Sequence, residues 1–199
     1  MALPSAYSVL VVSSNEKFSS TIKLMLPVSK FPRVDFSTSA AAARREMSAR
    51  AYDILLITSP LQDEFGTNLA IDVCEKTTSG VLLFVKNDRY DEVNAKVAPF
   101  GVLTLSIPTS TRTMRQTIDL LCSIRERMRR LEKKNVRLEE KMSEIRVVNR
   151  AKWILIEHQM MTEEQAHRFI EKTAMDECIT KRAVAEKIIS DTSFIQKTK

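Results

Sequence analysis

Basic side chains are the groups in this 199-residue chain whose type and distribution point most clearly to chemistry. Residues 111–199 carry 20 Lys and Arg against 14 Asp and Glu, whereas residues 1–110 carry 11 of each, so the second half holds the whole net charge of +6. Because ammonium and guanidinium groups neutralise phosphates, this asymmetry predicts a polyanion-binding half joined to a neutral globular half. A solvated helical surface is the plainer interpretation of the same charge.

Catalytic arrangements are missing from the sequence. It has no Ser/His/Asp arrangement, no Gly-rich phosphate loop and no plausible pair of carboxylates. His158 and His167 lie too far apart for a metal site, and Cys74, Cys122 and Cys178 lack metal-ligand spacing. We expect no enzyme activity, no cofactor and no metal. The absence of an 18-residue apolar run and of a leader segment predicts a cytoplasmic protein outside the membrane.

The first 110 residues alternate short apolar runs with helical patterns. The runs that predict strands are 7–12, 34–37, 53–57, 81–85 and 102–105. An alanine-rich segment, 40–51, predicts one of the intervening helices. Near-continuous apolar strands separated by helices indicate a parallel sheet that is covered on both faces.

These five strand–helix units resemble the response-regulator receiver, an α/β flavodoxin-like fold with strand order 2-1-3-4-5. The resemblance implies an acidic pair after the first strand, an aspartate after the third, Ser or Thr after the fourth and Lys after the fifth. The corresponding positions here hold Ser13 and Ser14, Thr58, Val85 and Ile107. Aspartyl phosphate needs a carboxylate nucleophile and a divalent ion. We therefore expect a pseudo-receiver, without a phosphoacceptor, that serves as a docking and dimerisation surface.

Two acids, Asp63 and Glu64, follow the third predicted strand. Their carboxylates could reach a cation at that edge of the sheet. Exposed acids are the norm in such loops, so we interpret them as part of a solvated loop.

A long helical segment without Gly or Pro begins near Met114 and carries a heptad pattern. The a positions are Leu121, Met128, Asn135 and Met142, and the d positions are Ile124, Leu131, Leu138 and Ile145. Buried asparagine at an a position specifies the register of a parallel coiled coil. The flanking charges of two copies attract at Arg127 with Glu132 and Lys134 with Glu139, and repel at Lys141 with Arg146. We expect a parallel homodimer over 128–145, while the earliest residues of the stripe also suit packing onto the receiver-like half.

The last fifty residues carry a second motif. Ala151-Lys152 precedes an apolar run, and Thr162-Glu163-Glu164-Gln165-Ala166 begins another helix with a capping box. A third helix is predicted from Thr180, a good N-cap residue. This pattern resembles the ANTAR domain, the RNA-binding output module of bacterial antitermination regulators.

One residue departs from the ANTAR pattern, because Trp153 occupies the position of the family's glycine. An indole at this position either fills the small core or stacks on an extruded base. Its apolar neighbours Ile154 and Ile156 favour packing in the core. Apolar residues of the following helices, among them Phe169, are also expected in the core.

The resemblance, which extends to the regulators of amidase operons, implies dimers that bind tandem hairpins in a leader mRNA and prevent terminator formation. It also implies control by a ligand-sensing partner protein. Cations for phosphates are needed at hairpin loops, and Lys152 lies inside the matched motif. The candidate RNA-binding residues are Arg146, Arg150, Lys152, Arg168, Lys172, Lys181, Arg182 and Lys187.

Together these patterns predict three parts: a pseudo-receiver over 1–110, a coiled-coil dimerisation helix over 111–147 and an all-α three-helix ANTAR domain over 148–199. Two alternatives stay open. A DNA-binding regulator would use the last helices as a helix-turn-helix, although the turn at 176–179 contains acids and no glycine. A scaffold would use the receiver-like half and the coil only to hold partners.

Overall fold

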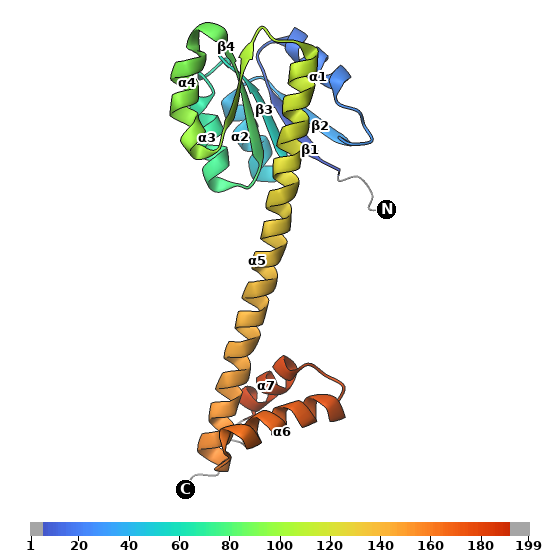
Figure 1. Cartoon of the computed structure of the whole chain (residues 1–199), viewed down its shortest axis with the longest axis vertical. Coiled ribbons are helices and arrows are strands. Elements are labelled where there is room, and N and C mark those ends of the chain that lie inside the picture. Colours follow the sequence, from blue (N-terminus) through green and yellow to red (C-terminus); the bar gives the residue numbers. More distant parts are fainter. Residues whose placement is uncertain (1–5, 192–199) are drawn as a thin grey trace. The chain divides into compact units, whose positions relative to one another are not determined.

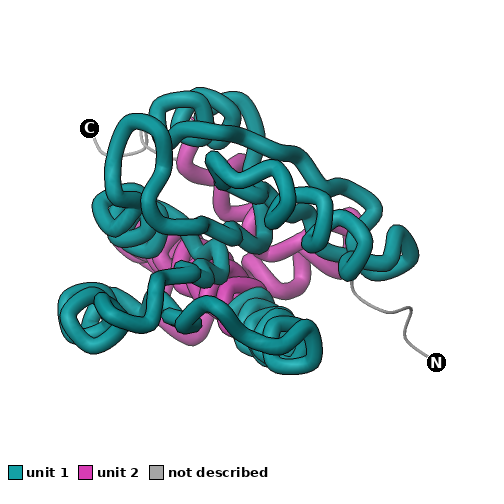
Figure 2. The backbone as a smooth tube through the Cα atoms, turned by 90° about the horizontal axis from the view of Figure 1, so that it is seen from above, with its two compact units in different colours: residues 1–130 teal, residues 131–199 magenta. Residues whose placement is uncertain are grey.

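A computed structural model describes residues 6–191 (Figure 1). The chain divides into two compact units, residues 1–130 and 131–199 (Figure 2). The outermost residues of the expected domains 1–110 and 148–199 therefore lie outside the described part of the chain. Among the described helices, none has both the length and the apolar character needed to cross a membrane.

A five-stranded parallel sheet forms the centre of the first unit, with the order β2-β1-β3-β4-β5 (Figure 1). The strands are β1 (Ser8–Val12), β2 (Arg33–Ser37), β3 (Ile54–Thr58), β4 (Gly80–Lys86) and β5 (Leu103–Ile107). All five residues of β3 are buried, as its continuous apolar sequence predicts for a strand covered on both faces. The predicted flavodoxin-like fold and strand order are confirmed.

Helices cover both faces of this sheet. They are α1 (Glu16–Met25), α2 (Ala40–Ala49), α3 (Thr67–Lys76), α4 (Tyr90–Val97) and the start of α5 (Thr111–Gln159), with short 3₁₀ turns η1 (Asn87–Arg89) and η2 (Ala98–Phe100). Side chains alternate along a strand, so Leu55 and Ile57 pack against α2, α3 and α4. Ile54 and Leu56 pack against α1 and the start of α5.

The beginning of α5 belongs to the first unit. Leu121 is only 2% exposed and lies in the core beneath the sheet. A Cβ atom on Gly80 would come within 2.8 Å of Leu121 Cδ1, so the absent side chain permits this close approach. Leu121 therefore packs on its own sheet, as expected for the earliest residues of the stripe, and its buried side chain is not available to the dimer interface for which it was also a candidate.

An ion-pair group extends this contact along α5. Arg129 Nη2 lies 2.6 Å from Asp53 Oδ1, and Arg125 Nε lies 3.4 Å from the same oxygen. The backbone amide of Ser8 donates to Asp53 Oδ2 at 2.9 Å. Through these contacts the first unit extends to residue 130. The receiver-like sequence pattern ends earlier, after the last strand.

The second unit combines the later part of α5 with α6 (Glu163–Asp176) and α7 (Lys181–Ser190). Its buried apolar residues are Ala151, Leu155, Ala166, Ile170, Ala174, Val184, Ala185 and Ile188. The capping box of α6 is confirmed: Thr162 Oγ1 accepts from Gln165 N at 3.3 Å, and Gln165 Oε1 accepts from Thr162 N at 2.8 Å. The predicted N-cap at Thr180 accepts from Ala183 N at 3.2 Å.

Two aromatic residues expected in this core lie outside it. Trp153 is 68% exposed, because the helix turns about 100° per residue and the core-facing positions are Ala151 and Leu155. Phe169 is 36% exposed, since it precedes Ile170 at the flank of the buried face of α6. The expectation of core packing was wrong for both side chains.

Candidate functional site

The carboxyl edge of the sheet in the first unit brings together hydroxyls in place of the receiver's acids. Thr58 Oγ1 donates to Ser13 Oγ at 2.8 Å, and both residues are buried. Ser14 Oγ donates to the Pro60 carbonyl oxygen at 3.1 Å. These hydroxyls satisfy one another or the backbone, and they provide neither a carboxylate nucleophile nor an anionic seat for a divalent ion.

The remaining two receiver positions hold apolar side chains. Val85 is buried in the core formed with α2, α3 and α4. Ile107 is partly buried on the opposite face, beside α1 and α5. Neither side chain offers a polar atom to a phosphoryl group.

The acids of the adjoining loop have structural partners. Asp63 accepts from the backbone amides of Ala40 and Ala41, both at 2.8 Å, at the start of α2. These hydrogen bonds hold the pKa of Asp63 below its ordinary value. Glu64 pairs with Arg44 at 3.1 Å. The expectation of a merely solvated loop was incomplete, because these carboxylates cap and brace α2. Within residues 6–191, no group of three or more metal-ligating side chains could hold an ion.

Charge in the second unit differs from the expectation drawn for the whole C-terminal half. Residues 131–199 carry 14 Lys and Arg and 12 Asp and Glu, so their net charge is only +2. Residues 111–130 carry six basic and two acidic residues. Two of these basic residues, Arg125 and Arg129, form ion pairs with Asp53. RNA binding by this unit would therefore depend on local arrangement more than on a broad positive field.

Most of the candidate RNA-binding cations are paired with carboxylates. The pairs are Lys152 with Glu163, Arg168 with Glu164, Lys181 with Glu171, Arg182 with Glu186 and Lys187 with Glu177. Arg146, Arg150 and Lys172 have no ion pair with any described residue. Exposed ion pairs contribute little and exchange readily, so a phosphate can replace the carboxylate partner.

Lys152, the candidate inside the matched motif, joins two helices. Its Nζ lies 3.0 Å from Glu163 Oε1, in the first turn of α6, and its side chain is only 15% exposed. The apolar stem therefore packs beside the core while the ammonium group reaches the surface. This position can hold the module together, bind a phosphate, or do both.

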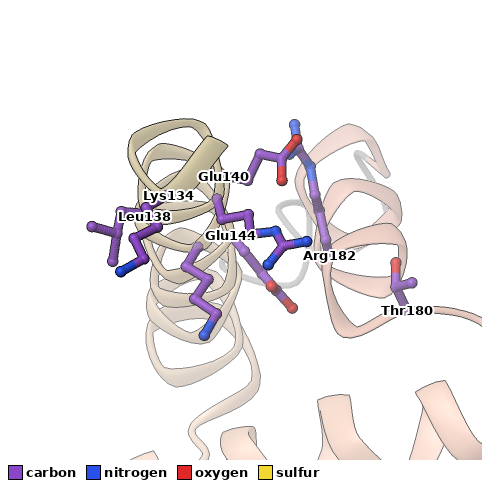
Figure 3. A pocket seen from close by; sticks show the side chains of 8 residues that line it. Lys134, Leu138, Glu140, Glu144, Thr180 and Arg182 are labelled. Atoms are coloured by element: carbon purple, nitrogen blue, oxygen red, sulfur yellow. The ribbon is translucent and has the colours of Figure 1, made fainter. Parts of the chain in front are cut away.

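Arg182 faces a groove of about 600 Å³ that lies between α5 and α7 within the second unit. Glu140 and Glu144 extend from α5 toward Arg182 (Figure 3). The hydrogen bond to Glu186 raises the pKa of Arg182, and the charges of Glu144 and Glu140 add to this effect. Arg182 thus pairs with Glu186 and lies in the field of two further carboxylates, which would compete with an RNA phosphate for its guanidinium group.

The predicted dimerisation stripe is exposed on the second unit. Leu131, Leu138, Met142 and Ile145 all have more than a third of their surface exposed, and Asn135 lies on the same helix face. Ile124 and Met128 are likewise 41% and 40% exposed on the first unit. Trp153 lies on the same helix face as this stripe. The sequence analysis missed this position because it placed the indole in the core. The spacing of Trp153 from Met142 and Ile145 could have indicated it.

Solved receiver domains share the fold of the first unit. A signal receiver domain of an HD domain-containing protein from Pseudomonas fluorescens Pf-5 has TM-score 0.58 and 16% identity, covering 65% of this chain and 96% of that chain. A CheY-like receiver domain from Methylobacillus flagellatus has TM-score 0.51 and 20% identity, covering 59% and 99%. NtrX from Brucella abortus has TM-score 0.57 and 14% identity, covering 64% and 29%. At these identities the likeness establishes a receiver-like fold alone.

A protein-family model matches most of the second unit. Residues 136–189 match the family model of the ANTAR domain. The match begins inside the helix expected as coiled coil, so the domain takes in part of the apolar stripe. Comparison with curated proteins gives no match. The chain thus joins a receiver-like fold to a segment, residues 136–189, that matches the ANTAR domain.

Proposed function

We propose that this protein is an RNA-binding transcription antitermination regulator without enzymatic activity, acting in the cytoplasm on nascent leader mRNA. The observation that carries the proposal is the ANTAR match over residues 136–189, on a helical module in which Arg146, Arg150 and Lys172 form no ion pair with a described residue. A dimer would bind two hairpins and prevent the terminator from forming. Each module would contribute cations to the phosphates of one loop.

The receiver-like unit is proposed to act without phosphorylation. The Thr58–Ser13 hydroxyl pair supports this, because aspartyl phosphate chemistry needs groups that this edge lacks. Control would then come from a protein partner that senses a small ligand and holds the regulator inactive. A regulator that binds its leader RNA constitutively, with no partner in cell extract lowering the affinity, would contradict this part of the proposal.

Dimerisation is proposed through a parallel pairing of α5. An exposed apolar stripe with a central asparagine is the pattern by which two-stranded coiled coils specify register. The attraction of Lys134 to Glu139 of the second copy supports the parallel direction. About three heptads are marginal for a coiled coil in isolation, so the receiver-like units would contribute to the association.

The direct experiment is a titration of the full chain with a two-hairpin leader RNA over a range of salt concentrations. If about five phosphates are neutralised per module, log K should fall with log salt with a slope of roughly −3.5. Competition with tRNA and duplex DNA separates the alternatives. Preference for hairpins supports antitermination, preference for duplex DNA indicates a DNA-binding regulator, and no binding indicates a scaffold.

A pair of variants assigns the role of Lys152. Lys152→Ala removes both the cation and the ion pair, whereas Glu163→Ala removes only the ion pair. If Lys152 binds phosphate, the first variant weakens RNA binding and the second leaves it unchanged or strengthens it. Equal loss in both variants, with equal loss of thermal stability, would show that the ion pair only holds the module together.

A scaffold function is the second candidate, and the small net charge of residues 131–199 favours it. In that case the ANTAR module has lost RNA binding and the chain only holds partners. The tRNA competition already distinguishes this outcome, because a scaffold gives no hairpin preference at any salt concentration.

A further inference from the structure

The exposed face of α5 continues past the predicted coiled coil into the ANTAR module. Leu138, Met142 and Ile145 lie on this face, and the next positions in line are Asn149 and Trp153, both exposed. The steps between these five residues are four, three, four and four, so every side chain returns to the same side of the helix. The apolar face therefore reaches two turns beyond Ile145.

Trp153 has no place in the core of its own module. Ala151 and Leu155, two residues before and after it, are fully buried against α6 and α7. A helix that buries these two positions directs the side chain between them to the opposite side. An indole that is 68% exposed presents a large apolar surface, at a position where burial would be strongly favourable.

We infer that Asn149 and Trp153 extend the dimer interface, so that the ANTAR modules of two copies are joined directly along α5. This inference rests on the proposed parallel dimer and specifies where its interface ends. In a parallel two-fold pairing each residue near the axis meets its own copy, so Asn149 faces Asn149 and Trp153 faces Trp153. Asn149 lies two heptads after Asn135, at the same a position, where paired amides can hydrogen-bond.

The two successive steps of four form a stutter in the heptad pattern. Met142 to Trp153 spans eleven residues in three turns, close to the natural period of an α-helix. A stutter unwinds the supercoil locally, so two helices would run straight past each other through residues 142–153. A straight pairing keeps both Trp153 side chains at the interface, whereas a strict heptad would favour Lys152, whose side chain packs beside the module core.

The flanking charges before Leu138 favour a second copy as the occupant, whereas Lys141 and Arg146 repel across the same pair. Lys134 and Glu139 attract across a parallel pair, and the exposed face of Leu138, Met142 and Ile145 would meet its own copy across the two-fold axis. Arg146 and Arg150, which have no ion pair with a described residue, lie beside the face and remain accessible in the dimer. Pairing along α5 would thus set the separation of the two cation pairs, and with it the separation of the RNA loops that a dimer can hold.

The test uses Trp153 as its own probe, because it is the only tryptophan in the chain. Full-length protein without RNA is diluted through the dimerisation range while tryptophan emission, acrylamide quenching and sedimentation are followed together. The inference predicts that emission moves to shorter wavelength and quenching decreases with the same midpoint as dimer formation. A dimer whose emission stays that of an exposed indole would overturn the inference and leave the dimer proposal intact. A monomer at every concentration would overturn both.

Variants separate a second copy from an RNA base as the occupant. Trp153→Ala should weaken dimerisation about tenfold or more without RNA, while Trp153→Leu, which keeps an apolar contact, should retain most of it. Met175→Ala removes another exposed apolar side chain, 78% exposed on α6, and should change nothing. If neither Trp153 variant alters dimerisation but both lose RNA affinity, the indole stacks on RNA and the inference is wrong. Circular dichroism checks that each variant is folded.

Discussion

The hydroxyl of Thr58 donates a 2.8 Å hydrogen bond to the hydroxyl of Ser13 beneath the carboxyl edge of the sheet. Where a working receiver concentrates negative charge, this protein places two neutral groups that satisfy each other. The pair explains how the edge remains stable without a metal ion, since no buried carboxylates repel one another there.

We expect no phosphorylation of the receiver-like unit. With Mg²⁺ and acetyl phosphate, the mass of the protein should not increase, and Mg²⁺ with beryllofluoride should not raise its melting temperature. The physical reason is the missing carboxylate at Thr58 and the missing acidic pair at Ser13 and Ser14. A phosphoryl-dependent mass increase would contradict the proposal.

A variant with restored acids serves as the positive comparison. The combination Ser13→Asp, Ser14→Asp and Thr58→Asp should lower the melting temperature without Mg²⁺, because three neighbouring carboxylates repel. Mg²⁺ should recover part of the loss in this variant and none in the wild type.

Gly80→Ala should destabilise the first unit by about 1–3 kcal/mol. The new methyl group would lie 2.8 Å from Leu121 Cδ1, and Leu121 is buried and has little room to move. Urea unfolding measures the loss. In a double-mutant cycle with Leu121→Ala, the stability loss of the double mutant should be smaller than the sum of the two single-mutant losses, because the smaller side chain at position 121 removes the clash. If the loss of the double mutant equals the sum of the two single losses, the contact between position 80 and Leu121 does not cause the destabilisation.

Asp53 should make the stability of the first unit depend on acid pH. Burial alone would raise its pKa, but hydrogen bonds from Ser8 and Arg129 outweigh burial and hold the pKa below its usual value of 3.8. A lowered pKa stabilises the fold fully above the unfolded value, and this contribution disappears as pH falls through the folded value. Asp53→Asn should therefore cost about 2 kcal/mol at pH 7, and this cost should decrease progressively as the pH falls below 3.8.

Urea unfolding of wild type and Asp53→Asn at several pH values measures this effect. Asp119→Asn is the matched control, because its pair with Lys30 is exposed and should contribute less than about 1 kcal/mol. A cost of Asp53→Asn that is the same at pH 7 and pH 3 would argue against the ion pair.

Asn135→Leu should strengthen self-association while reducing its specificity. A buried amide costs stability in a coiled coil but restricts it to one register, so leucine should tighten the dimer by about tenfold or more and permit higher oligomers. Sedimentation equilibrium measures both changes. Val136→Leu, at an exposed neighbouring position off the stripe, should have no effect. Weaker association of Asn135→Leu would place Asn135 outside the interface.

Thr162→Ala should destabilise the ANTAR module by about 1 kcal/mol, because it removes the hydroxyl that accepts from Gln165 N at the start of α6. Thr162→Ser keeps the acceptor and should retain most of the stability. Thermal unfolding followed by circular dichroism compares the two. Equal melting temperatures for both variants would show that the cap contributes nothing.

Local sequence signals were sufficient to predict the helices and strands. Apolar runs predicted the sheet, and the capping box predicted the start of α6. The residue types at Ser13, Ser14 and Thr58 predict that this edge has no phosphoacceptor. These properties depend on short-range periodicity, on backbone hydrogen bonds within one turn, or on which atoms a side chain carries.

Tertiary structure decided which surface covers each apolar face. The heptad pattern treats Leu121 and Met142 alike, yet the sheet buries the first and leaves the second 54% exposed. The apolar neighbour Ile154 predicted that Trp153 is buried in the core. In the structure Ala151 and Leu155 pack against α6 and α7, and the indole of Trp153 lies outside this core. Helical spacing determines the side of the helix on which a residue lies, whereas burial depends on a partner element that is distant in sequence.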